Sequence, residues 1–313
     1  MKNYMAFDIG GTTVKYARVD ENGKLFDRAS FETVDNAQAL INQMVDVVKK
    51  IETNHRLEGI GVSAPGIIRK DGFMVTGGAI QSLYDFPLSA ELAKKTGLAV
   101  TVENDANAAA IAEHWIGNAV HCDNYLTIVL GTGIGGGIVI NGEVYRGAHG
   151  MAGEFGWNVI HDIDLSENLE DYSLNLHAAV VYGLIRRYNA SKKRMGDDKS
   201  VNDAREILEA ADQGELLAQK AVDEFMQDLV VMLLNLFANF DPELILIGGG
   251  ISANVNFMEL LNRKLAEYVN RHGSISRIKN ISLGQVKPAK LCNDAGLVGA
   301  TYQIKKYLEK EGK

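Results

Sequence analysis

Hydrophobic residues along the chain form two similar blocks that lie about 120 residues apart. Met5–Val19 and Tyr125–Ile140 each consist of an apolar strand, a glycine-rich turn and a second apolar strand. Glycine permits a positive φ and lets bare backbone N–H groups approach a ligand, so two such turns facing each other could hold a polyphosphate between two lobes. The repeated pattern therefore predicts a nucleotide-dependent phosphotransferase.

The rest of the pattern predicts alternating strands and helices. Nearly continuous apolar runs predict short buried strands at Gly59–Ser63, Leu98–Val102 and Leu244–Ile247. Apolar residues recur at helical spacing in Asn36–Glu52, Ala106–Trp115, Asp203–Ala211, Glu215–Asn239 and Asp294–Leu308. The acidic stretch Asp162–Glu170 and the segment Lys192–Val201 are predicted to be loops.

The length and composition predict two packed domains. The chain has 313 residues, of which 46% are hydrophobic, enough for two cores by the usual size of a domain. We expect an N-terminal lobe over residues 1–118 and a C-terminal lobe over residues 119–300. The last residues, 301–313, are expected to return to the first lobe as a helix.

The charge and the cysteines narrow the class of protein further. A net charge of −8 argues against a nucleic-acid partner, which requires a basic face. Cys122 and Cys292 are the only cysteines, so neither a disulfide framework nor a cysteine-rich zinc site can form. We read neither a signal peptide nor a membrane-spanning stretch, and therefore expect a cytoplasmic protein without a membrane partner.

The second glycine turn contains a G-x-G-x-x-G pattern at Gly131, Gly133 and Gly136. Such a pattern can mark a dinucleotide-binding turn, but it must then open a helix. Here the chain continues as an apolar strand to a hairpin turn at Asn141-Gly142, which disfavours a dehydrogenase. A purely structural glycine turn is the simpler alternative, and a third glycine cluster after a later strand makes it less attractive.

Asp8 ends the first buried strand, where a carboxylate is costly unless it meets a cation or hydrogen-bond donors. We favour Mg²⁺, held through water, as that cation. The alternative is a turn aspartate bonded to the backbone of Thr12 or Thr13. Lys15 on the returning strand either faces a phosphate or is an ordinary exposed lysine.

Asn104 and Asp105 lie between a strand and an alanine-rich helix. Capping of that helix would by itself explain an aspartate at this place. However, residues at the carboxyl end of a parallel strand also border the ligand crevice of an α/β sheet. Asp105 could there accept the proton of a substrate hydroxyl that attacks phosphorus.

Glu154 lies in the glycine-dense segment Gly147–Trp157, close to Phe155 and Trp157. A carboxylate beside apolar ring faces suits a sugar, and an exposed surface glutamate is the alternative. Glu170 is a weaker candidate, because the local sequence also fits a simple helix start.

Four motifs resemble those of the ROK family of sugar kinases and sugar-responsive repressors: Asp8–Lys15 (DIGGTTVK), Glu103–Ala110 (ENDANAAA), Leu130–Gly137 (LGTGIGGG) and Leu246–Ser252 (LIGGGIS). The resemblance covers nearly the whole chain. It implies a duplicated, actin-like (ribonuclease H-like) α/β fold with two lobes, a homodimer, and the use of ATP and Mg²⁺.

The resemblance also implies roles for single residues. Asp105 would be the catalytic base, and the sugar would be held by Gly66, Asn104, Asp105, Glu154 and Glu170. The β- and γ-phosphates and Mg²⁺ would lie at Asp8, Gly10, Gly11, Thr12, Thr13 and Lys15. Thr132 and Gly133 would face the other side of the polyphosphate, and Gly249 and Gly250 the adenosine.

One block departs from the family pattern. The family usually has Glu-x-Gly-His followed by a cysteine cluster that binds zinc, whereas here Trp157 replaces the histidine and the cysteines are missing. His149, His161 and His177 do not restore a zinc spacing, so no zinc site is expected. Trp157 could stack on a sugar ring instead.

Zinc-less members resemble β-glucoside kinases, which phosphorylate the 6-hydroxyl of sugars such as cellobiose. Glucose and N-acetylmannosamine are the alternative substrates. A catalytically dead sugar sensor is the alternative from another class. A repressor is disfavoured, because Asp8 lies close to the first residue and the chain is acidic.

Overall fold

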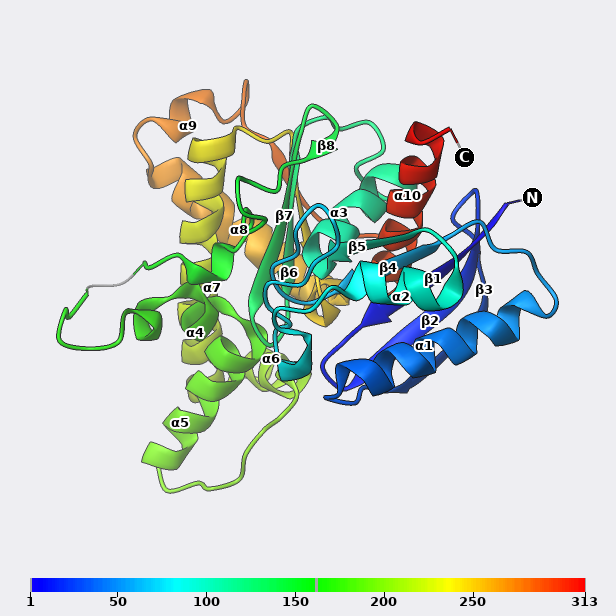
Figure 1. The fold of residues 1–313 in the computed structure, drawn as a ribbon. Helices are drawn as coiled ribbons and strands as arrows, with labels where there is room; N and C mark the ends of the chain where they lie inside the picture. Colours follow the sequence, from blue (N-terminus) through cyan, green and yellow to red (C-terminus); the bar gives the residue numbers. More distant parts are fainter. Residues whose placement is uncertain (1, 161–162, 313) are drawn as a thin grey trace. The chain divides into compact units, whose positions relative to one another are not determined.

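The computed structural model describes residues 2–160 and 163–312. The chain forms two compact units. Unit 1 comprises Met1–His121, Gly137–Ala152 and Asn293–Lys313, and unit 2 comprises Cys122–Gly136 and Gly153–Cys292. Figure 1 shows the elements of both units along the chain. These units are defined by their internal contacts, and the functional lobes with a boundary at residue 118 stay a prediction.

Unit 1 is built on a five-stranded sheet in the order β3-β2-β1-β4-β5. The strands are β1 (Asn3–Ile9), β2 (Thr13–Asp20), β3 (Leu25–Glu32), β4 (Ile60–Ala64) and β5 (Val100–Asn104). The first three are antiparallel, whereas β4 and β5 run parallel to β1. Three parallel strands therefore end at the same edge of this sheet.

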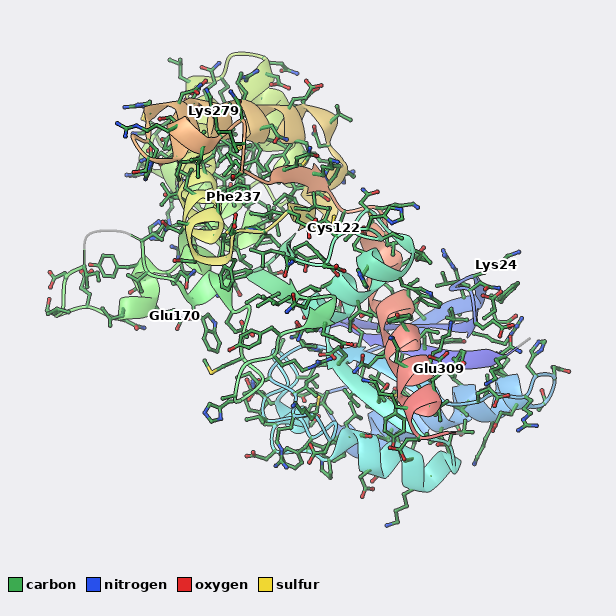
Figure 2. All side chains as sticks on the ribbon, turned by 90° about the horizontal axis from the view of Figure 1, so that it is seen from above. Lys24, Cys122, Glu170, Phe237, Lys279 and Glu309 are labelled. Carbon is green, nitrogen blue, oxygen red and sulfur yellow. The ribbon has the colours of Figure 1, made fainter. Side chains whose placement is uncertain are left out.

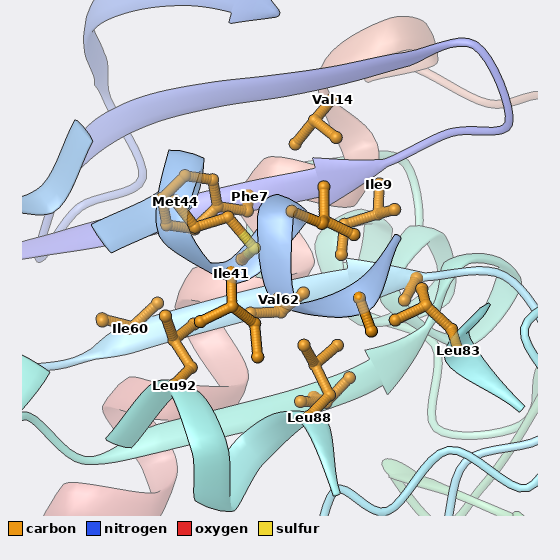
Figure 3. Close-up of a cluster of buried hydrophobic side chains, with 14 of the residues drawn as sticks. Phe7, Ile9, Val14, Ile41, Met44, Ile60, Val62, Leu83, Leu88 and Leu92 are labelled. Atoms are coloured by element: carbon orange, nitrogen blue, oxygen red, sulfur yellow. The ribbon is translucent and has the colours of Figure 1, made fainter. Parts of the chain in front are cut away.

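The two faces of β1 are covered by different helices, because successive side chains of a strand point to opposite faces. Phe7 and Ile9 pack into a buried cluster with Ile41 and Leu88 (Figure 3), residues of α1 (Ala37–Glu52) and α2 (Leu88–Thr96). Ala6 packs with Leu297 of α10 on the other side. Unit 1 is completed by η1 (Gln81–Leu83), α3 (Asp105–Ile116) and α10 (Ala295–Lys310).

Helix α10 approaches its neighbours closely through glycines. A Cβ at Gly61 of β4 would lie 2.1 Å from the carbonyl oxygen of Ala300. A Cβ at Gly299 would lie 1.9 Å from the carbonyl oxygen of Ala108 in α3. The glycines thus allow α10 to pack on both β4 and α3 at backbone distance.

The second sheet has the strand order β10-β9-β6-β7-β8. Its strands are β6 (Tyr125–Leu130), β7 (Ile134–Ile140), β8 (Glu143–Val144), β9 (Leu244–Gly248) and β10 (Gln285–Pro288). Strand β9 runs parallel to β6 and to β10. The chain passes from unit 2 to unit 1 within β7, which continues into β8 through Asn141 and Gly142, both at positive φ.

Unit 2 carries most of the helices. They are α4 (Leu174–Ala178), the π-helical turn η4 (Val180–Ile185), α5 (Arg186–Arg194), α6 (Ala204–Asp212), α7 (Leu216–Phe240), α8 (Val255–Arg271) and α9 (Ile275–Ile278). Short 3₁₀ turns are η2 (Phe155–Trp157), η3 (Leu169–Tyr172), η5 (Gly250–Ala253) and η6 (Cys292–Asp294). Over the described ranges, no helix is long and apolar enough to span a bilayer.

The strands and helices expected from periodicity are confirmed, with local corrections. The loop prediction for Lys192–Val201 is wrong at its start, because Lys192–Arg194 form the last turn of α5. The loop prediction for Asp162–Glu170 is wrong at its end, where Leu169 and Glu170 belong to η3, and Asp162 lies outside the described residues. The elements that were not predicted include helices α2, α4, α5, α8 and α9 and strand β10.

Candidate active site

The parallel strands of unit 1 bring the acidic candidates to one edge of the sheet. Asp8 of β1 pairs in register with Ser63 of β4, and Ala64 of β4 pairs with Asn104 of β5. Ligands of open α/β sheets bind at the carboxyl ends of parallel strands, which is where these residues lie. The first motif and the Asn104-Asp105 segment therefore share one edge.

Asp8 is held by a side chain that the sequence analysis missed. The Ser63 hydroxyl donates to Asp8 Oδ1 at 2.8 Å, and Lys15 Nζ lies 4.0 Å from Oδ2. Burial raises the pKa of Asp8, while Ser63 and Lys15 act to lower it. Within the described chain this hydrogen bond goes to Ser63 and not to the backbone of Thr12 or Thr13, so the turn-aspartate alternative is not supported.

The first turn of α10 also lies against Asp8. A Cβ at Gly296 would lie 2.4 Å from Asp8 Oδ1, so any larger residue here would displace the Asp8 carboxylate. The N-terminus of a helix favours a negative charge, because its free N–H groups carry partial positive charge. Gly296 is separated from Asp8 by most of the chain, and no local pattern indicated this contact.

The donor set at Asp8 fits Mg²⁺ bound through water and phosphate. Mg²⁺ prefers oxygen ligands and is commonly bound by one or two carboxylates together with substrate phosphates. Asp8 offers one carboxylate, 21% exposed, whose Oδ1 is already engaged by Ser63. Across the described residues there is no group of three or more His, Cys, Asp or Glu that could hold a metal by themselves.

Asn104 is the residue that caps α3. Its Oδ1 accepts hydrogen bonds from the backbone N–H groups of Ala106 at 3.0 Å and Asn107 at 3.1 Å. Its Nδ2 donates to the carbonyl oxygen of Gly66 at 3.0 Å, and a hydrogen bond from the Asn104 side chain also lowers the pKa of Asp105. Asp105 Oδ1 accepts the N–H of the same Ala106 at 2.8 Å, so Asp105 also contributes to the start of the helix.

Asp105 is the first residue of α3 and has a strongly perturbed acidity. Burial among protein atoms is the main cause that raises its pKa to about 6, and the negative charge of Asp8 adds to the shift. The side chain nevertheless keeps an open path to solvent. A carboxylate that is crowded by protein yet reachable, with a pKa near neutrality, suits a general base.

Different contacts explain the glycines of the Gly66 loop and those of the turn after β1. Gly66 has φ +97° and its Cβ position lies 2.3 Å from the carbonyl oxygen of Thr76, so this position requires glycine. Gly10 and Gly11 do not adopt positive φ, contrary to the reason that the sequence suggested for the phosphate turns. Gly10 is instead confined by the carbonyl oxygen of Thr13 at 3.0 Å from its Cβ position.

The turn after β6 in unit 2 contains a glycine with no packing role. Gly131 lacks a positive φ, and a Cβ there would meet nothing within 4 Å. Its carbonyl oxygen accepts the N–H groups of Val180 at 3.0 Å and Val181 at 3.2 Å, which start the π-helical turn η4. Thr132 at the tip of the turn is exposed.

Asn175 of α4 organises this turn and was missed by the sequence analysis. Its Oδ1 accepts the N–H of Ile134 at 2.8 Å. The same oxygen would lie 3.1 Å from a Cβ at Gly133 and 2.0 Å from one at Gly156. One side chain thus lies against both the turn after β6 and the segment that carries Glu154.

The turn after β9 lies beside the turn after β6. Gly249 has φ +88° and its Cβ position lies 1.9 Å from the carbonyl oxygen of Leu130. Gly250 begins η5, has no positive φ and has open space around its Cβ position. The two glycine clusters of unit 2 are therefore neighbours at the ends of adjacent parallel strands.

The sugar candidates of unit 2 differ in their exposure. Glu154 is partly buried and precedes η2, in which Phe155 is buried and packs edge-on against Phe240. Trp157 is 49% exposed, so about half of its surface is accessible. Glu170 lies on η3 and is exposed (Figure 2).

The histidines do not form a metal site in the part of the chain that is described. His149 is exposed, and His177 Nε2 lies 2.9 Å from the carbonyl oxygen of Asp171. His161 lies outside the described residues.

A family model supplies the deciding observation: the model described as "ROK family" matches residues 4–307. The chain belongs to the ROK family. A β-glucoside kinase of Klebsiella pneumoniae is 34% identical to this chain. The match covers 96% of this chain and 95% of the kinase.

Solved ROK structures share the fold. A ROK family glucokinase from Streptomyces griseus, in complex with glucose and AMPPNP, has a TM-score of 0.80 and 27% identity, and covers 97% of this chain and 99% of its own. A ROK family protein from Streptococcus pneumoniae, in complex with sucrose, has a TM-score of 0.82 and 27% identity, and covers 99% of each chain. The predicted two-lobed, actin-like ROK fold is confirmed.

Proposed function

We propose that this ROK protein is an ATP- and Mg²⁺-dependent kinase that phosphorylates the 6-hydroxyl of a sugar, with a β-glucoside such as cellobiose as the preferred substrate. The observation that carries the proposal is Asp105. It follows a parallel strand, begins a helix that Asn104 caps, is open to solvent and has a pKa of about 6.

In the proposed reaction, a carboxylate oxygen of Asp105 accepts the proton of the sugar hydroxyl. The hydroxyl oxygen forms a bond to the γ-phosphorus of ATP while the bond to the β–γ bridging oxygen breaks, and ADP leaves. Most of the rate enhancement of such a transfer comes from positioning and charge stabilisation, and the base adds to it.

The phosphates are assigned to the glycine turns. Gly10, Gly11, Thr12, Thr13 and Lys15 would hold the β- and γ-phosphates. Bound at Asp8 through water, Mg²⁺ would neutralise charge on these phosphates. In unit 2, Thr132 and Gly133 would contact the polyphosphate.

Gly131 and Gly250 support this assignment, because nothing in their own surroundings requires glycine. A ligand that approaches the bare backbone gives a reason for the missing side chains. Gly249 and Gly250 would lie beside the adenosine.

The sugar is assigned to Gly66, Asn104, Asp105, Glu154, Trp157 and Glu170. The half-exposed ring of Trp157 offers an apolar face for a sugar. The β-glucoside kinase relative and the sucrose complex support a substrate with a substituent on the anomeric carbon. Glucose and N-acetylmannosamine remain the alternatives, and a homodimer and a cytoplasmic location stay predictions from the sequence and the resemblance.

The test is ADP release from ATP and Mg²⁺ with glucose, cellobiose, gentiobiose, N-acetylglucosamine and N-acetylmannosamine. The proposal expects turnover with at least one sugar and the highest kcat/KM with a β-glucoside. A higher kcat/KM with glucose or N-acetylmannosamine would show that this sugar, and not a β-glucoside, is the preferred substrate. Thermal stabilisation by a sugar without turnover would favour the dead sensor instead.

A further inference from the structure

Glu103 is a buried carboxylate directly before Asn104 and Asp105, and the sequence analysis assigned no role to it. It is the last residue but one of β5, close to the start of α3, and is only 4% exposed. A buried carboxylate is costly unless several donors surround it.

The two oxygens of Glu103 serve different parts of unit 1. Oε1 accepts the backbone N–H of Asn104 at 3.1 Å and the side-chain amide of Asn107 at 3.2 Å, both at the start of α3. Oε2 accepts two hydrogen bonds from Arg146, one of them from Nε at 3.1 Å and the other from Nη2. One carboxylate thus joins the start of α3 to Arg146.

Arg146 lies at the start of the glycine-rich segment that leads to Glu154. Its carbonyl oxygen accepts the N–H of Ala152 at 3.3 Å, which closes residues 146–152 into a loop. Gly150 in this loop has φ +84°, and its Cβ position lies 2.7 Å from the carbonyl oxygen of Ile68. The loop therefore rests on the Gly66 loop, which Asn104 holds in turn.

We infer that Glu103 and Arg146 are a positioning pair that fixes the 146–152 loop to the start of α3, and thereby sets the orientation of Asp105 for the transfer to sugar. This inference rests on the proposed function. Neither residue touches the reacting atoms in this scheme, because both act through the segments that they hold.

Stability alone is a weak explanation for the pair. A buried ion pair commonly contributes no more to folding than apolar residues of the same size, because both charges lose their hydration. Four hydrogen bonds, two of them from Arg146, hold the Glu103 carboxylate in one orientation. A catalytic base such as Asp105 needs surroundings that are fixed in this way.

The kinetic test compares Arg146→Lys, Arg146→Met and Glu103→Gln with the wild type, using cellobiose and ATP. Arg146→Lys keeps the positive charge but cannot donate the two hydrogen bonds of a guanidinium to Glu103. It is included in case Arg146→Met does not fold. We expect kcat/KM for cellobiose to fall about 10- to 100-fold, with KM for ATP changed less than about twofold. The double variant Glu103→Gln/Arg146→Met should lose no more than the worse single variant, because the residues act as a unit.

The matched control is Arg56→Met, which removes an arginine from an exposed ion pair of unit 1, Arg56 Nε to Glu58 Oε1 at 3.7 Å. It should leave kcat/KM unchanged. Folded Arg146 variants with wild-type kcat/KM for cellobiose would overturn the inference, as would variants that keep the wild-type kcat and lose only affinity, with KM raised equally for cellobiose and for ATP.

Amide hydrogen exchange gives a readout that does not depend on activity. In Arg146→Met, exchange should speed up together in residues 103–108 and 146–152, and stay unchanged in α1. Faster exchange in only one of these segments would contradict the inference even if the wild type phosphorylated no sugar. A wild type without turnover would instead count against the proposed function, so the two failures are distinguishable.

Discussion

The surroundings of Asp105 make the stability of the fold depend on pH. Its pKa of about 6 in the folded protein exceeds the ordinary value of 3.8. The folded state therefore disfavours the ionised form. The loss of folding free energy that results is absent below pH 3.8. It grows as the pH rises from 3.8 to about 6 and has its full size above about pH 6.

Asp105→Asn should accordingly be more stable than the wild type at about pH 7.5, with the difference fading as the pH falls to about 4. Thermal unfolding at both pH values measures this. Asp198→Asn, at an exposed position of unit 2, should change stability little at either pH. A variant that is less stable at the higher pH would show that ionised Asp105 is favoured by the fold.

A substitution at Gly131 can test whether its backbone binds the nucleotide without disturbing the packing of side chains. Gly131→Ala introduces a methyl group into open space without a forbidden φ, so the free energy of unfolding should change by less than about 0.5 kcal/mol. KM for ATP should rise about tenfold if phosphate approaches this backbone. Steady-state kinetics and urea unfolding measure the two effects.

Gly97 is the contrasting position, since it ends α2 at φ +74° with equally open space. Gly97→Ala should cost about 1 kcal/mol in folding and leave KM for ATP unchanged. If both variants had the same KM for ATP, Gly131 would have no part in binding the nucleotide.

At the scale of elements, Asn175 of α4 lies against both the turn after β6 and the segment that carries Glu154. Asn175→Ala leaves the N–H of Ile134 without its acceptor, which should destabilise the fold by about 1–3 kcal/mol and raise KM for ATP. Asn175→Asp keeps an acceptor oxygen and should recover part of the affinity. Equal kinetics for Asn175→Ala and the wild type would remove Asn175 from the site.

Elements with a strong local pattern could be predicted from the sequence, and contacts between distant elements could not. The helix after Asp105 follows from its alanine-rich sequence, and the hairpin after Gly136 from Asn141-Gly142. In contrast, Ser63 and Gly296 reach Asp8 only because β4 and α10 pack beside β1. Even the identity of the cap was ambiguous, because Asn104 and Asp105 are both good capping residues.

At the scale of the whole molecule, the missing cysteine cluster predicts a fold that does not depend on zinc. The described residues contain no group of three or more metal-ligating side chains, and Cys122 and Cys292 are the only cysteines. If folding needs no zinc, as the sequence predicts, dialysis against EDTA should lower Tm by less than about 2 °C. Activity should return with Mg²⁺ alone, and a large loss of Tm that zinc restores would contradict this expectation.

The central claim is that Asp105 is the base of a sugar kinase, and the most direct measurement is the pH dependence of kcat/KM for cellobiose in the wild type and in Asp105→Asn. The wild-type value should fall as the pH drops below about 6, because Asp105 becomes protonated. In Asp105→Asn, kcat/KM for cellobiose should be about 100- to 10,000-fold lower and should no longer fall as the pH drops below about 6, the acidic limb of the wild-type profile. Wild-type turnover in Asp105→Asn, with the limb retained, would contradict the account.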